Sequence, residues 1–132
     1  MKELKSILHV DDDEDILDIT KMSLELVGGF EVLQSRSADH AFATLDQISP
    51  DLILLDVMMP HVDGPTFLKR VRNIARFESM PVIYMTAKSE TDLQERLLQD
   101  GVLGVVTKPF DPMTLPTQLI ELWNGAAGVQ AA

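Results

Sequence analysis

The sequence predicts an α/β fold in which parallel strands alternate with helices. Short apolar runs recur at residues 6–10, 52–55, 81–85 and 102–106. The segments between them carry apolar residues at helical spacing, which is typical of repeated strand–helix units around a parallel sheet. A polar residue that can bind a ligand follows each of these four runs closely. Because the carboxyl ends of neighbouring parallel strands share one crevice, these polar residues are predicted to meet there.

Length and composition limit the classes of protein that fit. A chain of 132 residues with 45% hydrophobic residues suits one domain with a substantial core. No stretch approaches about 18 uninterrupted apolar residues, and the N-terminus lacks the apolar region of a secretory signal, so no membrane association is expected. The absence of cysteine excludes disulfides and thiolate metal sites, and is compatible with a cytoplasmic protein. The net charge of −10 argues against direct nucleic-acid binding, which requires basic surfaces.

The first part of the chain predicts two strand–helix units. Residues 6–10 are apolar at nearly every position, as in a strand covered on both faces, and three acids at 13–15 then open a helix. Gly28 and Gly29 end this helix. Its predicted inward stripe is Ile16, Ile19, Leu24 and Val27. Residues 30–34 alternate as a strand near an edge, and Ser37 caps a second helix. The predicted inward face of that helix is Ala38, Ala41, Phe42, Leu45 and Ile48.

The middle of the chain predicts the centre of the sheet and a third helix. Pro50 ends the second helix, and residues 51–56 are the strongest candidate for a central strand. Asp63 and Gly64 predict a turn, and Pro65 suits the first turn of a helix. The apolar stripe of this helix is Phe67, Leu68, Val71, Ile74 and Ala75. The basic residues on its opposite side are interpreted as a solvated face: Lys69, Arg70, Arg72 and Arg76.

The last part of the chain predicts two strands and two helices. Residues 81–85 form a strand, 90–100 a weaker helix and 102–106 another strand. A final helix starts at 111–112 or at Thr114. Pro116 favours the late start or a kink, since a proline beyond the first turn removes a backbone hydrogen bond. This helix carries Leu115, Leu119, Leu122 and Trp123. The predicted domain covers 1–124, followed by a flexible tail at 125–132.

The polar residues at the strand ends point to one chemistry. Asp11 and Asp12 follow the first strand, Asp56 ends the central one, and Thr86 and Lys108 follow the last two. Carboxylates, a hydroxyl and an ammonium in one crevice suit a hard divalent cation and a phosphoryl group. Crowded carboxylates repel one another, and a bound cation relieves that repulsion. A carboxylate beside a cation and an ammonium can attack phosphorus and form an acyl phosphate.

Each of these residues also has a structural interpretation. The two acids after the first strand can simply open a helix, Asp56 can cap a turn, and Thr86 can be an ordinary strand-end hydroxyl. Lys108 is more informative because a lysine at a buried strand end needs an anionic partner, and we expect it to reach Asp56. The three histidines are interpreted as structural or solvated residues: His9, His40 and His61.

With these residues in place, the sequence resembles the response-regulator receiver domains of two-component signalling. The resemblance covers about residues 6–124, and the matching segments occur in the family's order and spacing. These segments are 7–13, 50–60, 63–64, 81–87 and 108–110. The resemblance implies a doubly wound, flavodoxin-like parallel sheet of five strands in the order 2-1-3-4-5, flanked by five helices.

The family also implies roles for the site residues. Asp56 would accept a phosphoryl group from a phosphohistidine on a sensor histidine kinase or a histidine phosphotransfer protein. Mg²⁺ would be held by Asp11, Asp12, Asp56 and the backbone carbonyl of Met58. Lys108 would pair with the acceptor and then with the phosphoryl oxygens. The protein would catalyse only its own phosphorylation and dephosphorylation, and so would not be an enzyme in the ordinary sense.

The resemblance further implies a route from phosphorylation to output. Thr86 would follow the phosphoryl group and change the surface of the fourth helix, fifth strand and fifth helix. Receivers commonly carry Tyr or Phe three residues before the lysine, whereas this chain has Val105, so an aromatic switch at that site is excluded. Output is then expected through the loop 87–90 or through a homodimer formed by the same surface. Met58 and Lys88 are expected to tune the lifetime of the acyl phosphate.

Two other functions fit parts of the sequence. One is a receiver-like binding module that is never phosphorylated. The other is a Mg²⁺-dependent aspartyl-phosphate phosphatase of the haloacid dehalogenase type, although such enzymes usually carry an aspartate where this chain has Met58. The expected partner of a receiver is a downstream protein or an attached output domain. Because few residues follow Pro109, we expect either a stand-alone receiver or part of a longer protein.

Overall fold

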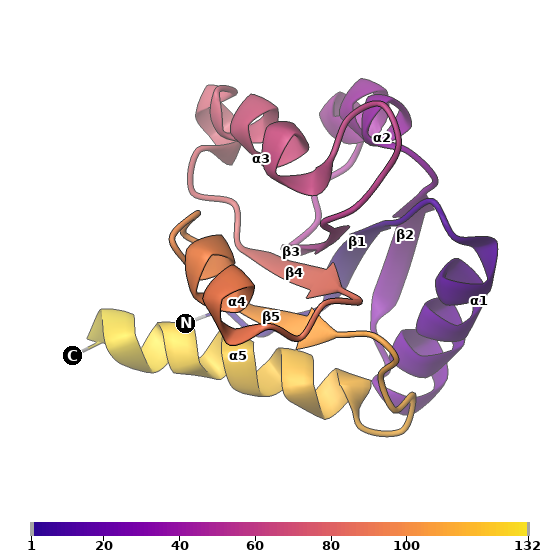
Figure 1. Ribbon diagram of the computed structural model, residues 1–132. Coiled ribbons are helices and arrows are strands. Elements are labelled where there is room, and N and C mark those ends of the chain that lie inside the picture. Colours follow the sequence, from indigo (N-terminus) through magenta and orange to yellow (C-terminus); the bar gives the residue numbers. More distant parts are fainter. Residues whose placement is uncertain (1, 132) are drawn as a thin grey trace.

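The computed structural model describes residues 2–131 and shows a parallel sheet between two layers of helices (Figure 1). Five parallel strands pair in the order β2-β1-β3-β4-β5, so the predicted α/β class and strand order are confirmed. The strands are β1 (Ser6–Val10), β2 (Glu31–Ser35), β3 (Leu52–Asp56), β4 (Val82–Thr86) and β5 (Gly104–Thr107).

Helices α1 and α5 cover one face of the sheet, and α2, α3 and α4 cover the other. Their bounds are α1 (Glu14–Met22), α2 (Ala38–Thr44), α3 (Gly64–Arg72), α4 (Thr91–Leu98) and α5 (Leu115–Ala131). Three short helical segments complete the chain: the π-helical η1 (Ser23–Val27) and the 3₁₀ segments η2 (Leu45–Gln47) and η3 (Ala75–Phe77). Each layer of helices buries its own apolar cluster against the sheet, so the central strands are covered on both sides.

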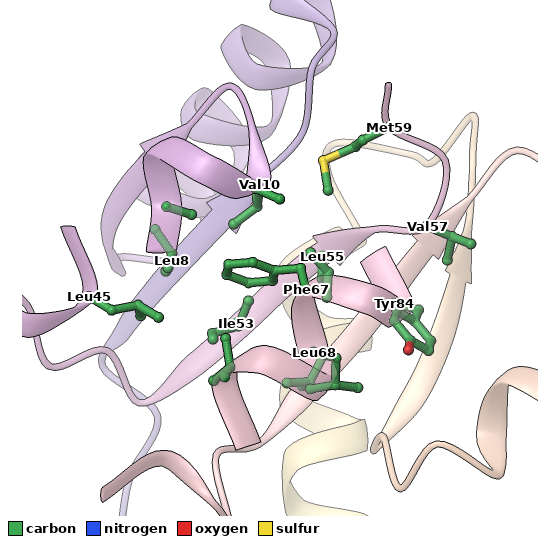
Figure 2. Packing of buried hydrophobic residues seen from close by; sticks show 14 of the residues in the cluster. Leu8, Val10, Leu45, Ile53, Leu55, Val57, Met59, Phe67, Leu68 and Tyr84 are labelled. Carbon is green, nitrogen blue, oxygen red and sulfur yellow. The ribbon is translucent and has the colours of Figure 1, made fainter. Parts of the chain in front are cut away.

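The central strand β3 shows why its sequence is apolar throughout. All five of its residues are buried. Ile53 and Leu55 pack under α2 and α3, as Figure 2 shows, while Leu52 and Leu54 point to the α1–α5 side. Alternate residues of a strand face opposite sides, and a strand covered on both sides therefore needs apolar residues at every position. The predictions of a central strand at 51–56 and of an edge strand after the first helix are confirmed.

The N-terminal caps of the helices show which acidic residues have a structural role and which are available in the crevice. The Asp13 side chain accepts hydrogen bonds from the backbone N–H groups of Asp15 and Ile16, at 2.9 and 3.3 Å, and so caps α1. Ser37 and Asp63 cap α2 and α3 in the same way. Because Asp13 performs the capping of α1, Asp11 and Asp12 are not needed for it.

The predicted inward stripe of the first helix is partly wrong. Ile19 and Val27 are exposed, whereas Leu17 and Thr20 are buried together with Leu24. The buried face contains polar residues, since Ser23 is also buried and donates from its hydroxyl to the carbonyl of Pro112. Both the predicted stripe and the observed one have helical spacing, and the prediction places the more hydrophobic stripe in the core. In the folded protein, contacts with other elements bury the stripe that contains Leu17 and Thr20 instead.

Three further side chains depart from the predicted inward stripes, and one of them is Ala75, which is exposed in η3. Phe42 of α2 was predicted to face inward but is exposed. Ile74 was assigned to the stripe of the third helix, but α3 ends at Arg72 and Ile74 follows it in extended conformation. Ile74 still packs against the core, because the chain turns back toward the sheet there.

The solvated-face interpretation of the basic residues is wrong for Arg72, which is half-buried, whereas Arg76 is exposed but also donates to backbone carbonyls. Arg72 donates to the carbonyls of Asp100 and Gly101, just beyond α4. Arg76 donates to the carbonyl of Leu45 at 2.7 Å, and its guanidinium lies 4.4 Å from the centre of the Phe77 ring. Both arginines therefore connect α3 and η3 to neighbouring chain segments through backbone carbonyls.

The end of the chain resolves the position of Pro116. Helix α5 begins at Leu115, which places Pro116 in the first turn, where no helical partner for its missing N–H exists. Strand β5 begins at Gly104, two residues later than predicted. Helix α5 continues to Ala131, while Ala132 and the side chains of 126–131 lie outside the described part of the chain. The boundary at 124 and the flexible tail at 125–132 therefore stay predictions.

We expect Gly64→Ala to destabilise the protein by about 1–3 kcal/mol, because an added Cβ would overpack the backbone of β3. That Cβ would lie 2.5 Å from the carbonyl oxygen of Asp56 and 3.0 Å from the Cα of Val57. Urea unfolding measures the effect. Gly125→Ala is the control, since no atom lies within 4 Å of a Cβ there, and it should be neutral or slightly stabilising. Equal behaviour of the two variants would contradict the close approach.

Candidate functional site at the carboxyl end of the sheet

The strand ends bring the predicted site residues to one edge of the sheet. Asp11 directly follows β1, Asp56 is the last residue of β3, and Thr86 is the last residue of β4. Lys108 follows β5, and its backbone N–H donates to the Thr86 carbonyl at 2.7 Å. Since β1, β3, β4 and β5 are neighbours in the sheet, residues far apart in the sequence share this edge.

Three carboxylates meet at this edge. One carboxylate oxygen from each of Asp11, Asp12 and Asp56 lies within 4.8 Å of the other two. Asp11 and Asp56 are buried, whereas Asp12 is exposed, so the group opens toward solvent on one side. Hard oxygen donors at this spacing fit a hard divalent cation such as Mg²⁺.

Lys108 contacts both buried carboxylates. Its Nζ lies 2.8 Å from Asp11 Oδ2 and 3.2 Å from Asp56 Oδ1. The predicted approach to Asp56 is therefore present, and the shorter contact with Asp11 was not predicted. Strand-end spacing places the lysine in the crevice but does not determine which carboxylate it meets. One ammonium thus offsets the repulsion between two buried acids.

The two buried acids have opposite electrostatic properties. Burial, together with the nearby charge of Asp11, raises the pKa of Asp56 to about 7. Burial also disfavours the charged form of Asp11, but the neighbouring His9 and Lys108 outweigh it and lower the pKa of Asp11 to about 2. The same two carboxylates raise the pKa of Lys108 although its burial acts in the opposite direction. A stable ion pair with Asp11 therefore lies beside a carboxyl group that resists ionisation.

Thr86 and Met58 lie on the Asp56 side of the crevice. Thr86 is buried, and its hydroxyl accepts a hydrogen bond from the Lys88 backbone at 3.1 Å. Thr86, Met58 and Lys88 help to line a cavity of about 360 Å³ between the β3 and β4 ends, α3 and α4. The Met58 N–H lies 3.4 Å from Asp56 Oδ1. Its carbonyl as a metal ligand stays a prediction.

Sequence reasoning missed one side chain of the crevice. His9 was interpreted as a structural residue within a buried strand, and it is buried, but its Nε2 also lies 3.7 Å from Asp11 Oδ2, which was not predicted. A signal was present, because a polar residue two positions before Asp11 must share its face of the strand. His40 fits the structural interpretation, since its Nδ1 lies 3.0 Å from the Ser35 hydroxyl.

The comparisons with known proteins identify the family. The profile of the response regulator receiver domain matches residues 7–120. This chain belongs to that family. The receiver domain is 38% identical over 112 residues to the response regulator Rre1 of Synechocystis, covering 85% of this chain and 48% of that protein. It is 36% identical over 115 residues to the phosphate regulon transcriptional regulatory protein PhoB of Pseudomonas aeruginosa, covering 87% and 50%.

Solved structures agree with these sequence relatives. The chemotaxis protein CheY4 of Vibrio cholerae superposes with a TM-score of 0.82 at 28% identity, covering 91% of this receiver domain and 99% of that chain. The receiver domain spans about half the length of the two curated relatives named above. Among its described residues, no helix has the length and apolar character needed to cross a membrane.

We expect Asp56→Asn to raise the free energy of unfolding of the metal-free receiver domain by on the order of 1–3 kcal/mol at pH 8. The folded state raises the pKa of Asp56 from 3.8 to about 7, so the wild type loses stability as the pH rises from about 4 to 7. The variant carries no charge at this position and escapes that loss. Chemical denaturation in the presence of a chelator, at several pH values, measures the difference.

The gain should be smallest below the unfolded pKa of 3.8, where Asp56 is protonated in both states. Asp46→Asn removes an exposed acid outside the crevice and serves as the control. A difference that does not change with pH, or a destabilised Asp56→Asn protein at pH 8, would contradict the electrostatic assignment.

Proposed function

We propose that this receiver domain is the phosphoacceptor of a two-component phosphorelay and that Asp56 carries the phosphoryl group. One observation carries the proposal: the Asp56 carboxyl lies within the three-acid group and 3.2 Å from the Lys108 ammonium. Membership of the receiver family supports the same residue, because Asp56 lies at the end of β3 inside the matched range 7–120.

The chemistry follows from these positions. A carboxylate oxygen of Asp56 attacks phosphorus, the bond from phosphorus to the donor's histidine nitrogen breaks, and the electron pair returns to the imidazole. Lys108 offsets the negative charge on the attacked group, and Thr86 offers a hydroxyl at the end of the neighbouring strand. Positioning and charge neutralisation supply most of the catalysis in such transfers.

The donor set fits Mg²⁺. Asp11, Asp12 and Asp56 would supply carboxylate oxygens, and the backbone carbonyl of Met58 would complete the protein ligands. When bound, the ion would neutralise charge on the acids and on the phosphoryl oxygens. Asp12 is exposed, which leaves room for water in the coordination shell, as Mg²⁺ usually requires.

An exposed apolar surface on α1 and η1 would suit the phosphoryl donor. Ile19, Met22 and Leu26 are exposed along α1 and η1, which follow the acids of β1. The Ser23–Pro112 hydrogen bond holds the loop that carries exposed Met113 against this helix. Exposed apolar groups near a reaction centre favour a protein partner. A histidine kinase or histidine phosphotransfer protein would place its phosphohistidine over Asp56 from this side.

Output would pass through Thr86 toward α4, β5 and α5. Val105 cannot act as an aromatic switch, but Tyr84 is its partner in the β4–β5 register. The Tyr84 hydroxyl donates to Asp100 at 2.7 Å, and Asp100 follows the end of α4. This bond connects the strand that bears Thr86 to the helix whose surface would change. A downstream protein, an attached output domain or a homodimer would recognise that surface.

The same proposal includes the cellular location of the receiver domain and the reactions that it would catalyse. The receiver domain would work in the cytoplasm and would process no substrate other than its own aspartyl phosphate, with Met58 and Lys88 tuning its lifetime. Direct nucleic-acid contact is not expected at a net charge of −10. The relatives Rre1 and PhoB are about twice as long as the region that matches this chain. The activities of those whole proteins are therefore not assigned to this chain.

We expect the protein to gain one phosphoryl group on incubation with acetyl phosphate and Mg²⁺, as intact-mass spectrometry would show. Asp56→Asn should abolish the gain because an amide is not a nucleophile at neutral pH, while the Asp46→Asn control should retain it. Incorporation at another residue in Asp56→Asn would refute the assignment. Absence of incorporation in the wild type would favour an unphosphorylated binding module, and turnover of phosphomonoesters would favour a phosphatase.

We expect Lys108→Met to retain Mg²⁺ binding but to weaken the response to phosphorylation. The variant keeps all three carboxylates and removes the cation that contacts Asp11 and Asp56. Calorimetry measures Mg²⁺ affinity, which should change by a few-fold at most. Amide NMR shifts of Thr86 and α4 after addition of beryllofluoride report the response. Lys69→Met on exposed α3 is the control, and a wild-type response in Lys108→Met would refute the role of the lysine.

A further inference from the structure

A buried polar chain leads from β2 to the acids of the crevice. Gln34 and His9 are directly opposite each other in the β1–β2 register. The Gln34 amide nitrogen donates to the Leu17 carbonyl at 2.7 Å and lies 3.2 Å from His9 Nδ1. On the other side of the ring, His9 Nε2 lies 3.7 Å from Asp11 Oδ2. The side chains of His9 and Asp11 are both fully buried.

These contacts determine the tautomer of His9. The Leu17 carbonyl can only accept, so the nitrogen of the Gln34 amide must face it. That same nitrogen can only donate, so His9 Nδ1 must accept, and the ring proton lies on Nε2. The ring therefore presents an N–H group to Asp11.

This N–H group is unsatisfied in the structure. Within the described residues, His9 Nε2 is one of the few buried polar atoms that lack a hydrogen-bond partner. The separation of 3.7 Å from Asp11 Oδ2 is longer than an ordinary hydrogen bond, so this contact is a weak one. An unpaired buried donor is costly, so its persistence calls for a partner that arrives in another state of the site.

Asp11 needs such a partner when Lys108 is redirected. Asp11 Oδ1 accepts from the Asp13 N–H at 3.0 Å, and Oδ2 accepts from Lys108 at 2.8 Å. Under the proposed function, Lys108 must turn from this shared position toward the phosphoryl group on Asp56. Oδ2 of Asp11 would then lose the Lys108 donor, and His9 Nε2 is aimed at that oxygen.

We propose that His9 is a positioning residue whose Nε2–H takes over Asp11 Oδ2 when Lys108 turns to the phosphoryl group. The inference rests on the proposed function for its trigger, but the ring geometry stands without it. Gln34 belongs to the same device because its amide holds the ring in the donating tautomer. His9 touches neither the phosphoryl group nor the acceptor, and it acts through Asp11.

The first test is the ¹⁵N NMR spectrum of His9 in the metal-free protein. We expect the Nε2–H tautomer in the wild type and a mixture of tautomers in Gln34→Leu, which lacks the amide. With Mg²⁺ and beryllofluoride, the Nε2 proton should shift downfield and exchange more slowly with water, as a new hydrogen bond requires. A proton on Nδ1 in the wild type, or an unchanged Nε2–H signal in the loaded state, would overturn the proposal.

The second test compares His9→Leu with His9→Gln. Leucine removes the donor, whereas the glutamine amide can replace the Nε2–H group. We expect phosphorylation by acetyl phosphate at saturating Mg²⁺ to slow roughly tenfold in His9→Leu and to recover largely in His9→Gln, as for other groups that orient a metal ligand. Circular dichroism and urea unfolding confirm that both variants are folded. Equal rates in wild type and folded His9→Leu would overturn the role of His9.

The outcomes separate this inference from the proposed function. If the wild type incorporates phosphate and folded His9→Leu does so equally fast, His9 has no positioning role and the phosphoacceptor function stands. If the wild type incorporates none, the phosphoacceptor function fails, and the tautomer measurement still decides the geometry of His9. If His9→Leu does not fold, Gln34→Leu decides through the Nε2–H signal, and retention of a pure Nε2–H tautomer there would overturn the proposal.

Discussion

The site depends on one ion pair, in which the Lys108 ammonium lies between two buried carboxylates. Without it, Asp11 and Asp56 would present like charges at the end of a hydrophobic sheet, which is costly in a medium of low polarity. The contact is unequal, since Asp11 is firmly ionised while Asp56 has a pKa raised to about 7. The crevice therefore holds an ion pair between Lys108 and Asp11. It also holds the Asp56 carboxyl group, whose ionised form a further cation would stabilise.

The rest of the fold holds these groups in place. Asp13 caps α1 and leaves the two preceding acids available at the end of β1. The backbone of β3 is packed against Gly64 at the start of α3, where any larger residue would collide with Asp56. The hydrogen bond between the Lys108 N–H and the Thr86 carbonyl fixes the end of β5 beside β4. Rigid strand ends thus place flexible side chains in a shared position, which is how parallel sheets support such sites.

Polar groups within the apolar layers connect the crevice to its surroundings. His9 and Gln34 lie on the α1 side of the sheet, and Tyr84 lies within the apolar cluster on the α3–α4 side, where Figure 2 shows its hydroxyl at the margin. The Tyr84–Asp100 bond occupies the region where Val105 has no aromatic ring to contribute. Each of these side chains depends on a partner from another element, and buried polar groups without partners are costly. The polar contacts around the acids and the lysine therefore join side chains from several elements of the fold.

The sequence alone determined the class of fold, the central strand β3, the Ser37 cap of α2 and the gathering of Asp11, Asp12, Asp56, Thr86 and Lys108. These features follow from local signals: apolar runs, capping residues and polar residues placed at strand ends. Only the tertiary structure decided which face of α1 is buried, that Arg72 and Arg76 pair with carbonyls, and that Lys108 lies closer to Asp11 than to Asp56. It also decided that His9 is aimed at Asp11. The reason is physical: periodicity gives the spacing of side chains along one element, whereas the partner of a charge or a buried donor depends on the distance between elements.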